Sequence, residues 1–134
     1  MLRAKDVMSA EVVSVTKYTP ILEAARLMVD YSISGLPVVD DDGSLAGVLS
    51  EKDAVVLFYE QKEAAEKNVA DYMTYPAVCF DENAPLLDVC DFLARNIFRR
   101  VPITADGKLA GIISIKDILE AVLREQERSF VQSH

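Results

Sequence analysis

Residues 47–53 read Gly-Val-Leu-Ser-Glu-Lys-Asp, and nearly the same sequence returns 64 positions later at residues 111–117, Gly-Ile-Ile-Ser-Ile-Lys-Asp. Working outward, Leu-Pro-Val at residues 36–38 returns as Val-Pro-Ile at residues 101–103, 65 positions later. The offset changes by one residue at an Asp-Gly turn, which indicates a hairpin that is one residue shorter in the second copy. A repeat of this length predicts two copies of one supersecondary unit that pack together, because each is too small to bury its apolar face alone.

Each copy is predicted to contain strand, helix, strand, hairpin, strand and helix in that order. A β-branched strand is expected at residues 12–15. Thr19-Pro20 after it is typical of a helix start, with Thr19 as the cap and Pro20 at the first helical position. Apolar residues then follow at helical spacing in both copies: Ile21, Ala24, Ala25 and Met28, and Leu86, Val89, Cys90 and Leu93 after Pro85.

Two strands are expected to flank the Asp-Gly turn of each copy. Because proline lacks an N–H group, Pro37 and Pro102 are each expected at a strand start or on an edge strand. The last helix of each copy is expected near residues 52–67 and 116–128. The charged, alanine-rich connector at residues 61–68 is expected to continue the first of these helices.

The predicted fold class is α/β (α+β), with two βαββα repeats at residues 5–65 and 66–128. Small three-stranded sheets flanked by helices are expected, packed about a pseudo-twofold axis. Two similar clefts between the halves are the places where function is expected. The chain leaves no room for an additional catalytic domain.

The composition restricts the partners. The net charge of −8 and the pI near 4.6 argue against nucleic acid and against an anionic membrane surface. No apolar run approaches the roughly 18–20 residues that span a bilayer. The N-terminus lacks the apolar segment of a secretory signal, so a cytoplasmic protein is expected.

Residue types that bind metals or carry out nucleophilic catalysis are sparse. Cys79 and Cys90 lack CxxC spacing and are interpreted as buried, reduced thiols that act as small apolar side chains. The single histidine is the last residue, His134, which disfavours a zinc site or a catalytic triad. Asp40-Asp41-Asp42 is interpreted as a solvated hairpin tip, since it lacks the spacing and the closing glutamate of a calcium loop. No phosphate-binding loop of the Gly-Lys-Ser/Thr type occurs.

The Ser-x-x-Asp motif at the strand-to-helix junction has two compatible interpretations. It is a capping-box pattern, in which Ser50 or Ser114 satisfies free N–H groups of the helix. The same helix start offers N–H donors and partial positive charge to a phosphate. Asp53 or Asp117, one turn further on, can then accept from both hydroxyls of a ribose.

The ordered motifs resemble a tandem pair of cystathionine beta-synthase (CBS) domains, also called a Bateman module, in a stand-alone CBS-domain protein. The first repeat has Asp-Val-Met-Ser, a proline-started helix, Ser-Gly-Leu-Pro-Val-Val-Asp-Asp-Asp-Gly and Gly-Val-Leu-Ser-Glu-Lys-Asp. The second has Tyr-Met-Thr, Phe-Arg-Arg-Val-Pro-Ile and Gly-Ile-Ile-Ser-Ile-Lys-Asp. The match covers about residues 5 to 125. It implies a module that binds AMP, ADP, ATP or S-adenosylmethionine, with no covalent cofactor.

The resemblance also implies the ligand-binding residues. Asp53 and Asp117 would hold the ribose, with Ser50 and Ser114 near the phosphate. Each cleft would mix the repeats, so Asp117 should face the first strand of repeat one, and Asp53 that of repeat two. The other positions are Ser9, Glu11, Val13, Ser34 and Gly35 in the first repeat, and Thr74, Ala77, Val78, Phe98, Arg99, Arg100 and Lys116 in the second.

Arg99 and Arg100, with Arg95 one turn earlier, form a cationic cluster in an acidic chain. It is interpreted either as a solvated helix end or as a guanidinium group for a phosphate. Its position just before Val-Pro matches where the family resemblance implies phosphate contacts, which favours the second interpretation. Repeat one has Ser34-Gly35 there, so the two clefts need not bind equally.

The function favoured by these observations is a regulatory, energy-sensing module that binds an adenine nucleotide without chemistry. A ligand-free interaction scaffold is the alternative, and a nucleotide hydrolase using Asp53 or Asp117 is disfavoured because no histidine or metal cluster accompanies them. A homodimer is expected, as the family resemblance implies, through surplus apolar residues: Leu57, Phe58, Tyr59, Val122 and Leu123. An effector protein is a further possible partner.

Overall fold

The structure is a computed structural model that describes residues 1–133. The chain divides into two compact units that exchange segments. The Asp53 unit consists of Val12–Val78 and Asp106–Leu109, and the Asp117 unit consists of Met1–Glu11, Cys79–Ala105 and the chain from Ala110 onward. Each unit therefore combines most of one repeat with a short segment of the other.

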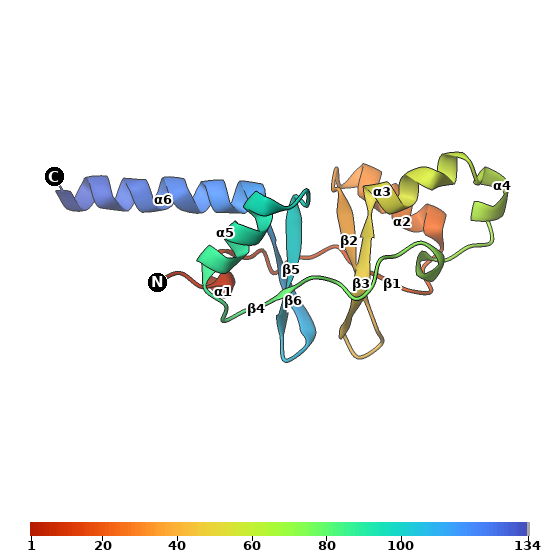
Figure 1. The fold of residues 1–134 in the computed structure, drawn as a ribbon, viewed down its shortest axis with the longest axis horizontal. Helices are drawn as coiled ribbons and strands as arrows, with labels where there is room; N and C mark the ends of the chain where they lie inside the picture. The colour runs from red at the N-terminus through yellow and green to blue at the C-terminus, as the bar shows by residue number, and fades with distance from the viewer. Residues whose placement is uncertain (134) are drawn as a thin grey trace. The chain divides into compact units, whose positions relative to one another are not determined.

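The Asp53 unit contains a three-stranded sheet in the order β1-β2-β3 (Figure 1). Strand β1 pairs with β2 in parallel, and β2 pairs with β3 antiparallel. The elements are β1 (Val15–Thr16), α2 (Ile21–Asp30), β2 (Gly35–Val39), β3 (Leu45–Ser50), α3 (Glu51–Val55), the 3₁₀ helix η1 (Val56–Phe58), α4 (Gln61–Ala64) and the 3₁₀ helix η2 (Val69–Asp71).

The second sheet has the order β4-β5-β6, with β4 parallel to β5. The elements are α1 (Ala4–Val7), β4 (Phe80–Asp81), α5 (Leu86–Arg95), β5 (Arg100–Ala105), β6 (Lys108–Ser114) and α6 (Ile115–Ser133). The predicted α/β class, with two small three-stranded sheets and flanking helices, is confirmed. No helix in the described residues is long and apolar enough to span a bilayer.

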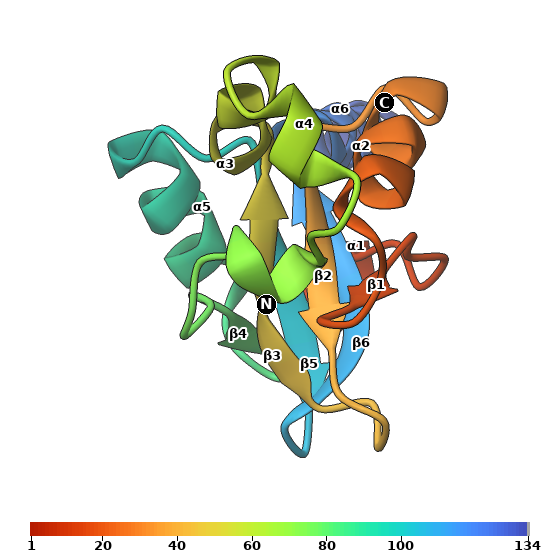
Figure 2. The same cartoon turned by 90° about the vertical axis from the view of Figure 1, so that its right-hand side faces the viewer.

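Each unit has its own apolar core, built on the predicted helical stripes. Ile21, Ala24 and Met28 of α2 are buried with Leu36 and Val38 of β2, and Figure 2 shows α2 beside that strand. In the Asp117 unit, Leu86, Val89 and Leu93 of α5 are buried with Val101 and Ile103 of β5. Burying one such side chain stabilises the fold by about 1.5–3 kcal/mol.

Three predicted element boundaries are wrong. The first strand is only Val15–Thr16, because β2 offers it partners only at Val38 and Val39. Pro20 and Pro85 are N-cap residues rather than the first helical residues, since both have an extended ψ of 135°.

The predicted helix over residues 52–67 is interrupted. It runs as α3, passes into the 3₁₀ helix η1, and restarts as α4 after Glu60, which has φ −112° and ψ 33°. Four of the five residues in the stretch 55–59, Val-Val-Leu-Phe-Tyr, are β-branched or aromatic and lose side-chain freedom in a helix. The helix predicted at residues 116–128 is confirmed within the continuous, 19-residue α6.

Pro37 stands inside the central strand β2, yet its missing N–H interrupts no ladder. Its register partner Val48 exchanges backbone hydrogen bonds with Thr74 on the opposite side, so the pair Pro37–Val48 is a non-hydrogen-bonded pair of the β2–β3 ladder. On its other side β1 begins to pair only at Val38. The prediction of a strand start or an edge is therefore wrong, because Pro37 and Pro102 are each the third residue of a central strand. Pro37 is tolerated there because it lies at a non-hydrogen-bonded position and before β1 begins to pair.

The hairpin and cysteine predictions have different outcomes. The second hairpin has a two-residue loop with positive φ at Asp106 (53°) and Gly107 (78°), which confirms the shorter turn. Both cysteines are free, but Cys79 is exposed, so its predicted burial is wrong. It lies in the connector before β4 rather than in a strand. Cys90 is half-buried, and desolvation raises the pKa of its thiol.

Candidate functional site

Each sheet is extended at its outer strand by one residue from the other repeat. Thr74 forms an antiparallel bridge to Val48 of β3, with N–H···O distances of 2.9 and 3.0 Å. Ser9 forms the same bridge to Ile112 of β6, at 2.9 and 3.0 Å. The exchanged segments thus lie next to the strands that lead into the two Ser-x-x-Asp motifs.

Two glycines allow this close approach, and the sequence reasoning assigned them no role. A Cβ at Gly47 would lie 2.6 Å from the carbonyl oxygen of Thr74, and a Cβ at Gly111 would lie 2.6 Å from Sδ of Met8 and 2.8 Å from the oxygen of Ser9. The sequence does mark these two positions, because Gly47 and Gly111 are the first residues of the two copies of the seven-residue motif. Met8 and Met73 each pack against the apolar core of their own unit.

In the Asp53 unit, Ser50 ends β3 and caps α3. The N–H of Asp53 donates to Ser50 Oγ (3.1 Å), and the N–H of Ser50 donates to Asp53 Oδ2 (2.9 Å), which completes a capping box. The hydroxyl of Thr74 lies 3.2 Å from both carboxylate oxygens of Asp53. Asp53 therefore contacts Thr74 of the second repeat, a residue that precedes the first strand of that repeat, β4. The expectation that Asp53 faces this first strand stays a prediction.

The Asp117 unit repeats the capping box. The N–H of Ser114 donates to Asp117 Oδ2 at 2.8 Å, and the N–H of Asp117 donates to Ser114 Oγ at 3.2 Å. Ser9, on the neighbouring bridge, is exposed. Both aspartates are half-buried, so each carboxylate is fixed by the backbone while part of it remains accessible.

The helix starts themselves have few N–H groups to offer. The first N–H of α3, from Glu51, donates to the carbonyl of Ser34 (2.8 Å), and the first N–H of α6, from Ile115, donates to the carbonyl of Arg99 (2.9 Å). The third N–H of each helix is occupied by the capping serine. A phosphate at these helix starts would therefore depend mainly on side chains and on the second N–H group.

The two units divide the predicted site residues equally. The Asp53 unit contains Val13, Ser34, Gly35, Ser50, Asp53, Thr74, Ala77 and Val78. The Asp117 unit contains Ser9, Glu11, Phe98, Arg99, Arg100, Ser114, Lys116 and Asp117. Val13 was expected beside Ser9 and Glu11, but the boundary between the units falls at Glu11, so Val13 lies in the other unit. Ligand binding by these residues stays a prediction.

The arginine cluster lies in the Asp117 unit. Arg95 ends α5, Arg99 precedes β5 and is exposed, and Arg100 opens β5 and is half-buried. The Nε atom of Arg100 is buried and has no hydrogen-bond partner among the described residues. None of the three arginines forms an ion pair within residues 1–133. The ion pairs in that range are Lys17–Asp40 and Arg128–Glu125.

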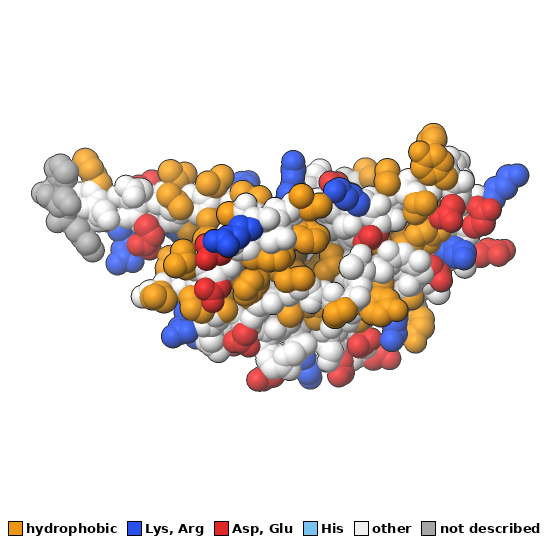
Figure 3. Space-filling view, in the orientation of Figure 1, with side chains coloured by type: hydrophobic (Ala, Val, Ile, Leu, Met, Phe, Trp, Pro, Cys, Tyr) orange, Lys and Arg blue, Asp and Glu red, His pale blue; other side chains and the backbone are white. Residues whose placement is uncertain are grey.

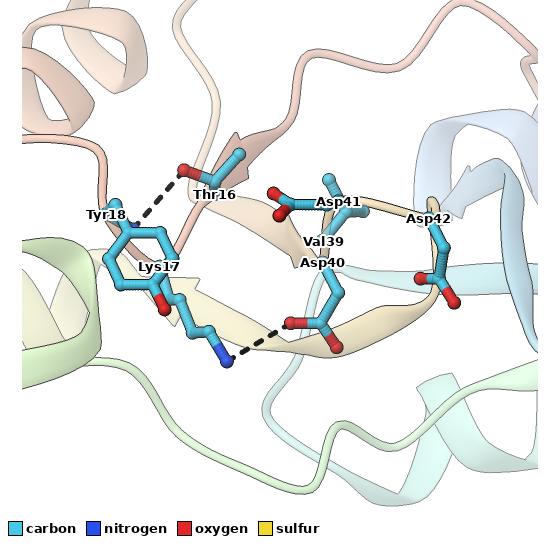
Figure 4. A pocket seen from close by; sticks show the side chains of 7 residues that line it. All are labelled: Thr16, Lys17, Tyr18, Val39, Asp40, Asp41 and Asp42. Atoms are coloured by element: carbon cyan, nitrogen blue, oxygen red, sulfur yellow. Dashed lines mark hydrogen bonds and ion pairs between the residues drawn. The ribbon is translucent and has the colours of Figure 1, made fainter.

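A hollow of about 310 Å³ lies in the Asp53 unit, away from the candidate site (Figure 4). Strand β2 begins at Gly35, the register partner of Ser50, and the hollow lies beyond its other end. It is lined by Thr16, Lys17, Tyr18, Val39, Asp40, Asp41 and Asp42.

The acidic residues 40–42 of the first hairpin, beside this hollow, have partners within the same unit. Lys17 Nζ lies 3.4 Å from Asp40, and the N–H of Ser44 donates to Asp42 and thereby lowers the pKa of that carboxyl. Among the described residues no group of three or more His, Cys, Asp or Glu is arranged to hold a metal ion. His134, on which the argument against a zinc site or a catalytic triad rests, lies outside the described residues.

Comparison with known proteins identifies relatives along nearly the whole chain. The family model described as the CBS domain matches residues 4–60 and 69–124. The chain is 33% identical over 119 residues to the uncharacterized protein YlbB of Bacillus subtilis, which covers 88% of this chain and 80% of YlbB. It is 34% identical to inosine-5'-monophosphate dehydrogenase of Methanocaldococcus jannaschii, but spans only 23% of that enzyme.

A solved structure resembles the described fold closely. The crystal structure of CBSX2 in complex with AMP superposes with a TM-score of 0.84 and 31% identity, covering 94% of this chain and 99% of that one. A further structure of CBSX2, from Arabidopsis thaliana, gives a TM-score of 0.82, covering 93% of this chain and 96% of that one.

Proposed function

The chain belongs to the CBS domain family, with two repeats in tandem, and on that premise we propose that it is a regulatory module that binds adenosine-containing ligands. Asp53 and Asp117 accept hydrogen bonds from the ribose hydroxyls, with Ser50 and Ser114 beside them. The 31% identical relative in complex with AMP supports this class of ligand.

The observation that carries the proposal is the environment of Asp53. The capping N–H of Ser50 orients its carboxylate, and a neighbouring hydroxyl, that of Thr74, lies at hydrogen-bond distance from both of its oxygens. The two hydroxyls of a ribose present the same donor type to a carboxylate. A fixed, half-buried carboxylate loses little side-chain entropy when it accepts them.

The remaining predicted residues complete the two sites in this proposal. Ala77 and Val78 line the base in the Asp53 unit, and Phe98 does so in the Asp117 unit. Backbone groups of Ser34 and Gly35, and of Ser9 and Glu11, read the edge of the base. The site binds without turnover, and a signal arises only if the ligand has different affinities for two states of the module.

Self-association is the second part of the proposal, because large apolar side chains remain exposed in both units. Phe58 and Tyr59 are 76% and 84% exposed, and Val122 and Leu123 of α6 are 49% and 63% exposed. Apolar side chains follow α6 in Figure 3. Leu57 does not belong to this set, contrary to expectation, because it is buried in the core.

Sedimentation of the wild-type chain and of Val122→Ser with Leu123→Ser tests the proposed dimer. The wild type is expected to sediment as a dimer at micromolar concentration, and the double variant as a monomer. Leu87→Ser, which changes an exposed side chain of α5, is the control and should remain dimeric. A monomeric wild type would refute the dimer.

The binding test is thermal melting with a panel of AMP, ADP, ATP, S-adenosylmethionine and adenosine. A ligand present at about 100 times its Kd adds about 2.7 kcal/mol to the free energy of unfolding. Asp53→Asn and Asp117→Asn should each remove one binding event. No shift with any compound would favour the ligand-free scaffold, and ATP turnover abolished by Asp117→Ala would favour the hydrolase.

The structure supplies matched controls for these variants. Asp71 accepts the N–H of Asn68 at 2.8 Å, and Asp6 accepts the N–H of Arg3 at 2.7 Å, in capping arrangements like those of the site aspartates. Asp71→Asn and Asp6→Asn therefore disturb the same kind of cap outside the proposed sites. They should lower the melting temperature without changing the ligand-induced shift.

A further inference from the structure

The two candidate sites can be compared position by position. The carbonyl of Ser34 accepts the first N–H of α3, and the carbonyl of Arg99 accepts the first N–H of α6, so Ser34 and Arg99 hold equivalent places. Gly35, the next residue, is the register partner of Ser50. By the repeat offset, Arg100 is its counterpart, and it is the first residue of strand β5.

These equivalent positions carry opposite charge. In the Asp53 unit they are Ser34, Gly35, Glu51, Lys52 and Asp53, with a formal charge of −1 from one lysine and two carboxylates. In the Asp117 unit the positions are Arg99, Arg100, Ile115, Lys116 and Asp117, with a formal charge of +2 from three cations and one carboxylate. The exposed Glu11 of the same unit reduces that value to +1, which is still opposite in sign.

The arginines of the Asp117 unit also have unused donors. Arg99 and Arg100 form no ion pair among the described residues, and the buried Nε of Arg100 lacks a hydrogen-bond partner there. A buried donor without a partner destabilises the folded protein, because it has lost its hydrogen bonds to water. An anion that accepts from Nε would give this donor its missing partner, and arginine suits phosphate because it can donate two parallel hydrogen bonds.

The Asp53 unit has no guanidinium at the positions equivalent to Arg99 and Arg100, which are Ser34 and Gly35. Gly35 is buried, and a Cβ there would lie 3.3 Å from the carbonyl oxygen of Leu49, which leaves little room for a longer side chain. Glu51 stands at the first helical position, where its carboxylate repels a phosphate. Lys52 has its counterpart in Lys116, so it does not distinguish the two sites.

From this contrast, and resting on the proposed function, we infer that the two sites select adenosine ligands by charge. The Asp117 site takes a nucleotide that carries a phosphate. The Asp53 site takes an adenosine compound without one.

The decisive measurement is calorimetric titration with AMP and with adenosine, which differ only by the phosphate. Asp53→Asn leaves the Asp117 site to be measured, and Asp117→Asn leaves the Asp53 site. In the first variant AMP is expected to bind at least about ten-fold more tightly than adenosine, the size of effect that charge-assisted hydrogen bonds give. In the second variant adenosine should bind at least as tightly as AMP.

Charge exchange then tests the cause. Arg99→Ser, at an exposed position, should reduce the preference of the Asp117 site for AMP, and Ser34→Arg should create such a preference at the Asp53 site. Added salt should weaken AMP binding at the Asp117 site and leave adenosine binding nearly unchanged. Because these two variants keep both aspartates, they also test the inference if an Asp→Asn variant fails to fold.

The outcomes separate the inference from the function on which it rests. If both sites bind and show the same ratio of AMP to adenosine affinity, the inference is overturned and the proposed function stands. If neither compound binds the wild type, while the protein is folded by its melting curve, both are overturned.

Discussion

The two units carry the same motif but continue it differently. After Ser50 the helix α3 lasts five residues and gives way to a 3₁₀ turn, whereas after Ser114 the helix α6 runs for 19 residues. Both starts have the same capping box, with hydrogen bonds between 2.8 and 3.2 Å. The motif therefore determines where a helix begins, and the residues after it determine how far the helix extends.

The positions that bring the exchanged segments together are the same in both units, although the side chains around them differ. Gly47 faces the backbone of Thr74, while Gly111 faces both the Met8 side chain and the Ser9 backbone. The shared geometry indicates that a small residue is needed for the bridge itself. Because the neighbours differ, the clash caused by an added Cβ should be relieved by different second substitutions in the two units.

Alanine at either glycine should give the largest effect. A Cβ within 3.0 Å of a backbone oxygen forces the exchanged segment to move, so Gly47→Ala and Gly111→Ala should each cost about 1–3 kcal/mol in the free energy of unfolding. Urea denaturation measures this loss. Ala46→Gly, which instead removes a side chain from the neighbouring position, is the control for a general effect at the strand.

A second substitution sharpens this comparison. Met8→Ala removes the atoms 2.6 and 2.9 Å from the added Cβ, so it should partly rescue Gly111→Ala. Met73→Ala should not rescue Gly47→Ala, because Sδ of Met73 is 3.5 Å away and the close contact is with backbone. Equal rescue in both units would contradict this assignment of the contacts.

Removing the capping serines should have an intermediate effect. Ser50→Ala and Ser114→Ala each lose one side-chain hydrogen bond to a helix N–H and should cost about 1 kcal/mol. Their local consequences should differ, because α3 has no further turns to support it. Amide hydrogen exchange should show loss of protection throughout residues 51–55 but only in the first turn of α6. Uniform loss along α6 would contradict this view.

The sequence predicts the elements well where a pattern is local and repeated. The buried stripes of α2 and α5 follow from apolar spacing alone, and the shorter second hairpin follows from the loss of one residue at an Asp-Gly turn. The capping boxes at Ser50 and Ser114 follow from the Ser-x-x-Asp spacing. In the site, the contact between Asp53 and Thr74 joins residues of both repeats, as the family resemblance implies.

What the sequence missed depends on contacts distant along the chain. The length of β1 is fixed by where β2 offers partners, and the exposure of Cys79 by its position in the connector before β4. Leu57 was counted among the surplus apolar residues of a dimer surface, yet it packs in the core. Gly47 and Gly111 stand out as the first residues of the repeated motif, but their roles depend on a segment of the other repeat, which the motif does not identify.

The smallest predicted effect concerns Cys90, which occupies the place of Ala25 in the other repeat. Desolvation raises the pKa of its thiol above the ordinary value of a free cysteine in the folded protein. The unfolded chain therefore ionises first as the pH rises past 9, so this group's contribution to folding is present below that pH and declines above it. The difference in unfolding free energy between the wild type and Cys90→Ala should shift against the wild type from pH 7.5 to pH 9.5. Cys79→Ala, at an exposed thiol, should show no such shift, and equal behaviour of the two variants would contradict a role for burial.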